Sequence, residues 1–594
     1  MNKKRFQSYG PICLYAIFFL LAAVLVDSNY YLSLFSQAAI YTILAVSLQL
    51  IFGYAGQVSL AQAGFFGIGA YTSAILTLHL DVHFLVAFLL SGIAAALASI
   101  ILSPMAKLSE IYFAMSTFAF NLILTILFAN GGSWTGGWNG LTNIPYPDIL
   151  GWSVDSKKEF FILASILLIV QYVFMVRLTE GKLGRNFRAI RDNQLAAASV
   201  GINIGATKTK GFVIGCFWAG LAGSVMVHMY AFISPEPFQF IESITVILMV
   251  VLGGLGSFTG ALLGGFGVTF FNEFLKEIPL YRPIIYGASI VLMMIFWPNG
   301  LYGLLQKWLK TAKGPMPSVK SAVNLKQILS RSKAENNEIL KLEQLTKQFG
   351  GIKALTDVSL RVRSGEIFGL IGPNGAGKTT FINMVTGLER PTSGKIFFQQ
   401  KEITGRPMNE LSSMGMVRTF QTSKLFESMT VLENVTAGMS SKLKNDVGMA
   451  LLQNQKFRAE EEHAVNVAYQ LIKLTGLEDK AFEICANLSY GHRRLAEIAR
   501  ALASQPEILF LDEPAAGLNL KEREQLQALI LRLRDEFGMT IFIVEHDLNL
   551  LSNICDHMAV LNFGVKIADG SPEEVMRNPD VVQAYLGRRD KKHA

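Results

Sequence analysis

A glycine-rich turn followed by lysine and threonine carries the most specific chemistry in this sequence. It reads GPNGAGKT over residues 372–379 and lies between an apolar strand pattern and a helix pattern. In the motif G-x-x-x-x-G-K-T, glycines let backbone N–H groups approach phosphates, and the helix N-terminus adds its positive dipole end. Lys378 can reach the β- and γ-phosphates of a nucleotide, and the Thr379 hydroxyl can bind Mg²⁺. The turn therefore predicts a nucleotide-phosphate site.

Two adjacent carboxylates end a second buried-strand pattern, ILFLDEP, at residues 508–514. Asp512, at the strand end, can hold Mg²⁺ directly or through water. Glu513 is placed to orient and deprotonate an attacking water. Because the pair lies downstream of the phosphate turn, in a part of the chain with alternating strand and helix patterns, it predicts nucleotide hydrolysis in an α/β domain.

The elements that position these residues occupy only the second half of the chain. The 594 residues are 51% hydrophobic and 16% charged, whereas soluble proteins carry about 25% charged residues. Apolar runs dominate up to Trp297, and the charge density of a soluble domain begins near Pro315. We therefore expect a transmembrane domain at 1–310, a cytoplasmic linker at 311–338 and a nucleotide-binding domain at 339–594.

The basic residues of the first half indicate membrane topology and not nucleic-acid binding. The net charge is +8, but the lysines and arginines are not gathered in one patch with interleaved aromatic residues. About ten spans, each near the roughly 20 residues that a bilayer needs, place the N-terminus and the basic loop 179–210 in the cytoplasm. The predicted spans are 11–27, 31–53, 57–78, 84–105, 111–129, 160–178, 211–232, 241–252, 257–271 and 284–298. The four cysteines form no CxxC pair, so we expect neither a zinc site nor a disulfide scaffold.

Glycine interrupts two of the apolar segments, at 53–71 and 251–267. Interrupted helices in corresponding halves indicate an inverted repeat with a transport path at its interface. Small residues also allow close helix packing without any transport, and the sequence weighs both readings evenly. Asn121 and Glu242 are polar groups in or near predicted spans, so they are functional candidates. His79 and His83 have a spacing that a metal site could use, but we expect a solvated turn outside the membrane.

Three further motifs connect the second half to a known family. ANLSYGHRRLAEIARAL at 486–502 resembles the signature segment of ABC proteins, TFQ at 419–421 resembles their Q-loop, and IVEHD at 543–547 resembles their H-loop. These motifs, the phosphate turn and the DE pair occur in the family's order. Residues 339–588 therefore resemble an ABC nucleotide-binding domain, an α/β P-loop fold.

The resemblance implies a role for each matching residue. Glu513 is the general base, Gln421 senses Mg²⁺ and the attacking water, and His546 contacts the γ-phosphate. The metal is supported by Thr379, Gln421 and Asp512. ATP is bound by Phe349, which stacks on adenine, and by Gly372, Asn374, Gly375, Gly377, Lys378, Thr379, Thr380, Ser489 and Gly491.

The second half departs from the commonest family pattern at two places. Ser489 and Gly491 are kept and would face the ATP of a second nucleotide-binding domain. The usual LSGGQ is here LSYGH, ending in His492, and Asn519 stands where the family usually has Asp. These departures put the strength of that half-site in question.

Both halves also resemble one subfamily, the importers of branched-chain amino acids. LDEPAAGLN and NPDVVQAYLG resemble the LivG-type ATPase, and GYAGQVSLAQAGFFGIGAY, TGGWNGLTNIP, GRNFRAIRDNQLAAASVGIN and VVLGGLGS resemble the LivM-type permease. The chain is thus similar to a LivM–LivG fusion. The resemblance implies ATP-driven import of branched-chain, hydrophobic amino acids across the bacterial inner membrane, with the ATPase domain in the cytoplasm.

The family assembles two membrane domains and two nucleotide-binding domains. The expected partners are therefore a LivH-like permease and a LivF-like ATPase, or a second copy of this chain, with a periplasmic substrate-binding protein and the surrounding lipid. An importer of urea or short-chain amides with the same architecture is the alternative. An ABC exporter would carry long cytoplasmic helical extensions, and a membrane-anchored ATPase that does not transport would not need so many spans.

The polar segment GRNFRAIRDNQLAAASVG, residues 184–201, lies in the basic cytoplasmic loop. Its arginines fix topology in any case. AAAS favours a helix, and Phe187, Ile190 and Leu195 could form an apolar patch on it. In the importer family the matching loop is the coupling helix, seated in a groove of the ATPase near the Q-loop. We therefore expect the segment to dock on an ATPase domain, either this chain's own or a partner's.

Overall fold

The computed structural model describes residues 3–107, 110–297, 299–308, 323–330 and 338–586, which form two compact units. Unit 1 takes its residues from 1–191, 204–316 and 447–453, and unit 2 from 192–203, 317–446 and 454–594. Each unit therefore includes one short segment from the sequence range of the other. These two segments, 192–203 and 447–453, follow from the fold and were not predicted.

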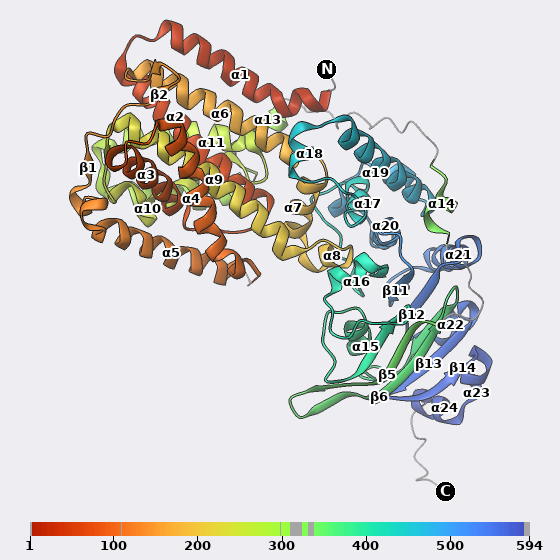
Figure 1. Ribbon diagram of the computed structural model, residues 1–594. Coiled ribbons are helices and arrows are strands. Elements are labelled where there is room, and N and C mark those ends of the chain that lie inside the picture. Colours follow the sequence, from red (N-terminus) through yellow and green to blue (C-terminus); the bar gives the residue numbers. More distant parts are fainter. Residues whose placement is uncertain (1–2, 108–109, 298, 309–322, 331–337, 587–594) are drawn as a thin grey trace. The chain divides into compact units, whose positions relative to one another are not determined.

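Unit 1 is helical, and a helix lies over each predicted span (Figure 1). Among the described residues, five helical segments are long and apolar enough to cross a bilayer: Asn29–Tyr54, Phe84–Ala106, Glu110–Asn130, Lys157–Thr179 and Ile204–Tyr230. Their outer faces carry exposed aliphatic side chains, such as Ile101 at 70% and Ile111 at 72% exposure. Apolar surface of this extent is typical of helices that face lipid, since water-soluble surfaces rarely leave such patches uncovered.

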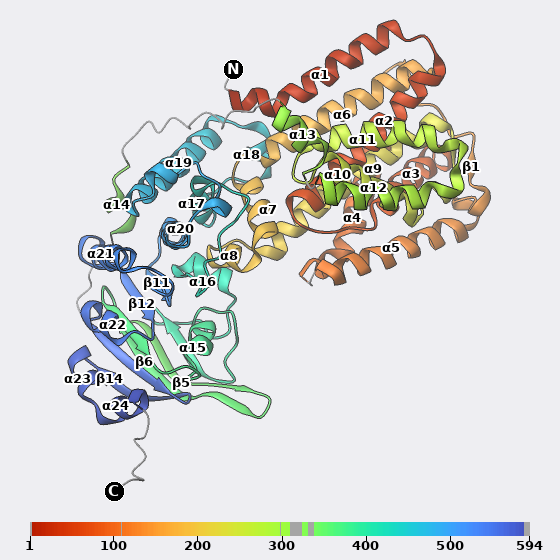
Figure 2. The ribbon, with the colours of Figure 1, turned by 180° about the vertical axis from the view of Figure 1, so that it is seen from behind.

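The helices of unit 1 pack mainly as α3, α4 and α9 together and as α2 with α6, α10 and α11 (Figure 1). From behind, α12 lies beside α10 (Figure 2). The bounds are α1 Lys3–Leu25, α2 Asn29–Leu48, η1 Gln49–Tyr54, α3 Gln62–His79, α4 Phe84–Leu102, η2 Ser103–Lys107, α5 Glu110–Asn130, α6 Lys157–Thr179, α7 Lys182–Asp192, α9 Ile204–Tyr230, α10 Phe240–Gly253, α11 Phe258–Phe274, α12 Arg282–Phe296 and α13 Gly300–Trp308.

The third predicted span begins later than expected. Residues 55–61 form no helix, and α3 starts only at Gln62. Side chains of neighbouring helices serve the freed backbone: Leu60 N donates to Thr117 Oγ1 at 3.0 Å, and Ala63 N donates to Ser243 Oγ at 3.0 Å. Non-helical backbone is tolerated at membrane depth only where protein groups satisfy it in this way.

The interrupting glycines serve close helix packing. A Cβ on Gly69 of α3 would collide with the backbone of Gly220 in α9, and one on Gly253 would collide with the carbonyl of Gly260. The two glycine-broken segments also meet, because a Cβ on Gly53 would lie 2.8 Å from the backbone nitrogen of Gly256. The packing reading is therefore confirmed, while the inverted repeat and a path at its interface stay predictions.

The prediction of one apolar patch on residues 184–201 is wrong. Two short helices, α7 and α8 (Gln194–Ser199), replace the single one, because Asn193 caps α8 by accepting from Ala196 N at 3.0 Å. Phe187 is fully buried in unit 1, where its ring packs against Gly211 of α9. Leu195 is half-buried and belongs to unit 2. The three side chains therefore do not share one face.

Unit 2 contains two sheets that meet the phosphate loop. A six-stranded sheet has the order β10-β11-β12-β7-β13-β14 and is parallel except for its last pair. An antiparallel sheet has the order β6-β5-β8-β9. The strands are β5 Glu338–Phe349, β6 Ile352–Arg363, β7 Ile367–Ile371, β8 Ser393–Phe398, β9 Lys401–Glu402, β10 Met416–Arg418, β11 Ile508–Asp512, β12 Thr540–Val544, β13 His557–Asn562 and β14 Val565–Gly570.

One face of the parallel sheet shares a core with the antiparallel sheet and two helices, and the other face shares a core with most of the remaining helices of unit 2. The bounds of these helices are α14 Leu325–Leu329, α15 Lys378–Val385, α16 Met408–Met414, α17 Val431–Gly438, α19 Gln455–Leu474, α20 Tyr490–Ala503, α21 Leu520–Phe537, α22 Leu548–Ile554, α23 Pro572–Arg577 and α24 Pro579–Leu586, while α18 Val447–Leu452 belongs to unit 1. β7, β11 and β12 are buried throughout, so they position the residues at their carboxyl ends firmly.

The predicted linker 311–338 contains an ordered helix. Residues 311–322 and 331–337, with Pro315 and Pro317, lie outside the described residues. Between them α14 forms, capped by Asn324, and Leu329 is fully buried in the core of unit 2. The expectation of a structureless tether is therefore wrong for residues 325–329, because one apolar side chain finds a place in the core.

Candidate functional site

The phosphate loop follows β7, the strand between β12 and β13. Gly375 and Gly377 have φ angles of +82° and +98°, which L side chains rarely adopt. A Cβ on Gly377 would also lie 2.7 Å from the Ala354 carbonyl. The glycines are thus required by backbone conformation and by close approach. The loop leads directly into α15, whose free N–H groups point toward the place of a phosphate.

Lys378 begins α15 and lies inside the loop. Its ammonium donates to the carbonyls of Gly372 at 2.6 Å and Pro373 at 3.1 Å. Burial lowers the pKa of this lysine, and the carboxylates of Glu513 and Asp512 act in the opposite direction. The side chain is therefore held by two weak acceptors that phosphate oxygens can replace.

Asp512 ends β11 and is paired with a buried arginine that the sequence did not reveal. Arg418 Nη2 lies 2.9 Å from Asp512 Oδ2, and both side chains are 4% exposed. The guanidinium also donates to Asn383 Oδ1 on α15 at 2.7 Å and to Thr386 Oγ1, directly after that helix, at 3.1 Å. Burial raises the pKa of Asp512, and Arg418 opposes that rise. The arginine keeps one carboxylate oxygen fixed and leaves Oδ1 with no hydrogen-bond partner among the described residues.

Glu513 and Gln421 lie together, as the sequence motifs predicted. Gln421 Nε2 donates to Glu513 Oε2 at 2.9 Å, and His546 Nδ1 lies 4.0 Å from the same oxygen. Glu513 has a φ angle of +43°, an uncommon conformation for a residue with a side chain. Strained backbone at a carboxylate is typical of functional sites.

Glu545, next to His546, is a second acid that the sequence did not single out. It is 1% exposed, and its oxygens accept from Ala515 N at 2.9 Å and His546 N at 3.2 Å. Burial raises its pKa, and these two backbone donors oppose the rise. Glu545 therefore fixes the loop that carries His546 against the turn after Glu513. A charged residue directly after a buried strand was the available signal.

The residue predicted to stack on adenine and several of those predicted to bind phosphate are exposed or half-buried. Phe349 is 47% exposed at the end of β5, with the Lys347 ammonium 4.7 Å from its ring centre. Asn374 and Thr379 are exposed, and Thr380 is half-buried, around the phosphate loop. Exposed groups of this kind are free to contact a nucleotide.

The signature segment begins α20. Ser489 caps the helix by accepting from His492 N at 3.4 Å. Gly491 is buried, and a Cβ there would collide with the carboxylate of Glu522. Asn519, where the family usually has Asp, caps α21 in a reciprocal capping box with Glu522. The Asn therefore keeps the local helix start.

The residues around the loop fit a Mg²⁺ ion through oxygen donors. Asp512 offers a carboxylate oxygen and Thr379 a hydroxyl, which are ligand types that Mg²⁺ prefers. Among the described residues, no group of three or more His, Cys, Asp or Glu side chains is arranged to hold a metal. A magnesium site here would therefore depend on nucleotide oxygens and water as well.

The polar candidates of the membrane half have structural partners. His83 caps α4 by accepting from Leu85 N at 3.3 Å, and His79 contacts the ring of Trp134. Asn121 is fully buried and donates to the Phe238 carbonyl at 3.4 Å. Glu242 is half-buried beside Tyr41. His79 ends α3 and His83 caps α4, so the pair flanks the short connection between these helices, whereas both residues were expected in the turn itself.

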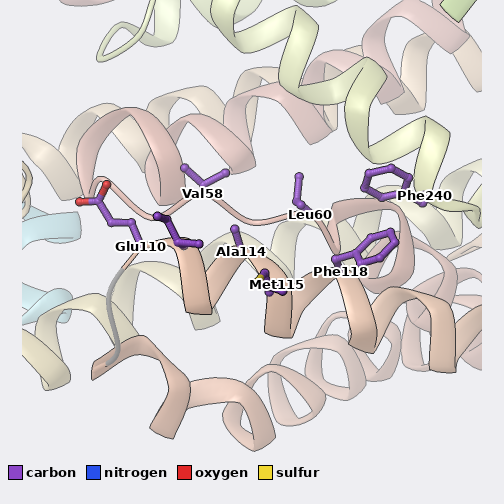
Figure 3. A pocket seen from close by; sticks show the side chains of 8 residues that line it. Val58, Leu60, Glu110, Ala114, Met115, Phe118 and Phe240 are labelled. Carbon is purple, nitrogen blue, oxygen red and sulfur yellow. The ribbon is translucent and has the colours of Figure 1, made fainter.

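An apolar groove of about 510 Å³ opens on unit 1 beside the interrupted third span. Glu110 lies at one end, and the rings of Phe118 and Phe240 lie at the other, 4.6 Å apart (Figure 3). The lining consists of Val58, Leu60, Glu110, Ile111, Ala114, Met115, Phe118 and Phe240. This lining suits an aliphatic group, and the carboxylate favours a positive charge at its end.

Residues 192–203 pack within unit 2. Asp192 Oδ2 accepts from Ser428 N at 2.8 Å, seven residues after Gln421 in the sequence. Gly201 follows α8 with φ +82°, and a Cβ there would lie 2.9 Å from Ser441 Cβ and 3.1 Å from Ser413 Oγ. A segment from the membrane half of the sequence is thus fitted to the ATP-binding unit beyond the Q-loop.

Comparison with known proteins assigns both halves. Residues 30–296 match the family described as the permease component of the branched-chain amino acid transport system. Residues 355–516 match the ABC transporter family, and residues 565–591 match the branched-chain amino acid ATP-binding cassette transporter family.

Two relatives, LivG and BraF, agree with this assignment. The LivG protein of Salmonella typhimurium, a high-affinity branched-chain amino acid transport ATP-binding protein, is 45% identical over 42% of this chain and 98% of LivG. BraF of Pseudomonas aeruginosa, which has the same description, is 43% identical over the same shares. A nucleotide-free ATP-binding cassette of solved structure is 35% identical over 42% of this chain and 100% of that chain, with a TM-score of 0.38. The chain belongs to the branched-chain amino acid family of ABC transporters, and it joins a permease to an ATP-hydrolysing cassette.

Proposed function

We propose that this protein imports branched-chain amino acids into bacteria and drives the import by ATP hydrolysis. The observation that carries the proposal is that one chain joins a permease of the branched-chain amino acid family to a cassette 45% identical to LivG. The name of LivG supports the substrate class, because the ATPase and permease of such a system serve one substrate.

The membrane is the bacterial inner membrane, and the cassette lies on its cytoplasmic side. The basic residues Lys182, Arg185, Arg188 and Arg191 support this orientation, since positive charges are retained on the cytoplasmic side of inner-membrane proteins. The predicted topology places both this loop and the C-terminal cassette on that side.

Hydrolysis occurs at the end of β11. Lys378 gives up its carbonyl partners for phosphate oxygens, and the loop N–H groups bind the other phosphates. Glu513 accepts a proton from water as the water oxygen attacks the γ-phosphorus, and the bond from that phosphorus to the bridging oxygen breaks, so that ADP leaves with the electron pair. Gln421 and His546 orient the reacting groups. Mg²⁺, held by Asp512, Thr379 and Gln421, would neutralise developing charge on the phosphates.

The assembly contains two permeases and two cassettes. This chain supplies one of each, and a LivH-like permease with a LivF-like ATPase supplies the others; a second copy of this chain is the other arrangement. Ser489 and Gly491 then contact ATP bound to the partner's cassette. A periplasmic binding protein delivers the substrate.

Residues 192–203 transmit movement between cassette and permease. The chain runs directly from this segment into α9, a membrane span, so a shift of the segment pulls on that helix. Its contacts with Ser428, Ser413 and Ser441 tie it to the cassette. The segment therefore has the position that a coupling element needs.

ATP hydrolysis by the assembled transporter in lipid discs tests the proposal. Binding protein loaded with leucine, isoleucine or valine should stimulate hydrolysis, and binding protein offered urea or a short amide should not. Stimulation by urea alone would reassign the substrate class. Hydrolysis that ignores the binding protein under every condition would refute import.

A further inference from the structure

Arg494 joins three parts of the cassette that the family motifs treat separately. It lies on α20, five residues after Ser489, and is 1% exposed. Its guanidinium donates to the carbonyls of Asp512 at 2.8 Å, Glu513 at 2.6 Å and Pro514 at 3.2 Å. One side chain thus binds the carbonyls of three consecutive residues around the candidate base.

The backbone at Glu513 needs contacts from other parts of the cassette to keep its conformation. Glu513 lies directly after the last residue of β11, and its φ of +43° is disfavoured for a residue with a side chain. Such a conformation persists only where surrounding groups over-determine it. The Glu513 N–H donates to the Val544 carbonyl at 2.8 Å, and the Glu513 carbonyl accepts from Ala516 N at 3.3 Å and from the Arg494 guanidinium at 2.6 Å.

The same arginine also holds the Q-loop. Arg494 Nη1 donates to the Phe420 carbonyl, while Glu497, its ion-pair partner at 3.1 Å, accepts from Phe420 N at 3.1 Å. Both backbone groups of Phe420 are therefore fixed to α20. The next residue is Gln421, whose amide bonds to the Glu513 carboxylate at 2.9 Å.

We propose that Arg494 is a positioning residue that sets Glu513 and Gln421 in one common geometry and links that geometry to the start of α20. The planar guanidinium is suited to this because its donors form a fixed fork. A shift of α20 when Ser489 meets the partner's ATP then moves the base and the Q-loop together. The inference rests on the proposed role of Glu513 as the base.

Arg494→Lys keeps the charge and removes the fork, and it is tested in the assembled transporter. Misplacement of a catalytic group by about 1 Å can cost roughly 100-fold in rate, so kcat for ATP should fall about 10- to 100-fold. KM for ATP should stay within about twofold, since Arg494 does not touch the phosphate loop. A fall in both kcat and ATP affinity would overturn the proposal, because it would indicate general disruption.

Arg500→Lys is the matched control. Arg500 lies on the same helix, is 1% exposed and pairs with the same Glu497 at 3.9 Å. Within the described part of the chain it forms no hydrogen bond or ion pair with residues 512–514. Its kcat should remain near the wild-type value, while its melting temperature should change as much as that of Arg494→Lys. Equal loss of kcat in both variants would overturn a specific role for Arg494.

A double-mutant cycle with Glu513→Gln separates positioning from folding. Single-turnover hydrolysis is measured with excess transporter. If Arg494 acts through the base, Arg494→Lys should slow wild type but hardly change the residual rate of Glu513→Gln. Independent, multiplicative losses would overturn the proposal. Rapid hydrolysis by Glu513→Gln alone would refute the base assignment instead, so the two failures are distinguishable.

Discussion

Gly201→Ala tests whether residues 192–203 couple the cassette to the permease. Gly201 ends α8 in a Schellman motif: its N–H donates to the Ala198 carbonyl at 3.0 Å, and Ile202 N donates to the Ala197 carbonyl at 3.1 Å. An alanine at φ +82° strains the backbone, because a left-handed residue with a Cβ costs about 1–2 kcal/mol. The new Cβ would also lie 2.9 Å from Ser441 Cβ, closer than real contacts allow.

The strain alone lowers the docking equilibrium constant about 5- to 30-fold, and the close contact adds to this. In proteoliposomes with the partner subunits, leucine moved per ATP hydrolysed should therefore fall, because hydrolysis continues while docking weakens. Ser441→Gly in the same chain removes the nearest neighbour and should restore part of the ratio. Gly267→Ala in α11 is the control, since a Cβ there meets open space. An unchanged ratio in Gly201→Ala, or an equal loss in Gly267→Ala, would refute the reasoning.

Three further predictions concern the cassette. Glu513→Gln keeps the shape of the side chain but removes the base, so turnover should fall about 10²- to 10⁴-fold with ATP binding intact; near-normal turnover would contradict the assignment. Arg418→Met leaves the Asp512 carboxylate buried without its cation, which should destabilise unit 2 by about 3–5 kcal/mol; Arg418→Met with Asp512→Asn should melt at a higher temperature than the single variant. The hydrogen bond to Asp569 raises the pKa of His557. The stabilisation of unit 2 by this pair is therefore complete below the ordinary histidine pKa near 6.5 and is lost as pH rises through the raised value. His557→Asn should remove this loss from melting curves recorded between acidic and alkaline pH.

The sequence predicted what is local along the chain. A span depends on the length of one apolar run, and the phosphate loop depends on glycines beside a strand and a helix, so both could be located by residue number. The proximity of Gln421 and Glu513 was also expected, but only through the resemblance to ABC proteins. Their 2.9 Å contact in the structure agrees with that expectation.

The contacts that support the site could not be predicted because they join distant parts of the chain. Arg418 and Asp512 are 94 residues apart in sequence and meet because β10 and β11 are neighbours in the sheet. Strand order follows from the whole fold, and no local pattern specifies it. Arg494 carries no signal beyond its place on a basic, amphipathic helix.

Residues 184–201 also show that contacts between distant parts of the chain could not be predicted from the sequence. The sequence indicated helix and burial correctly for Phe187, but not which core would bury it. Phe187 packs against α9, whereas residues from Asp192 onward pack with the cassette. Phe187→Ala is consequently a core substitution, which costs about 3–5 kcal/mol, and it is a poor probe of coupling.

Uptake by native cells tests the central claim most directly, because all partner subunits are present. Cells lacking this gene, complemented with the wild-type chain or with Glu513→Gln, are supplied with labelled leucine, isoleucine, valine and urea. We predict that the wild-type chain restores accumulation of the branched-chain amino acids against their gradient and that Glu513→Gln does not. Restored accumulation of urea without any of the three amino acids, or equal uptake by Glu513→Gln, would contradict ATP-driven import of branched-chain amino acids.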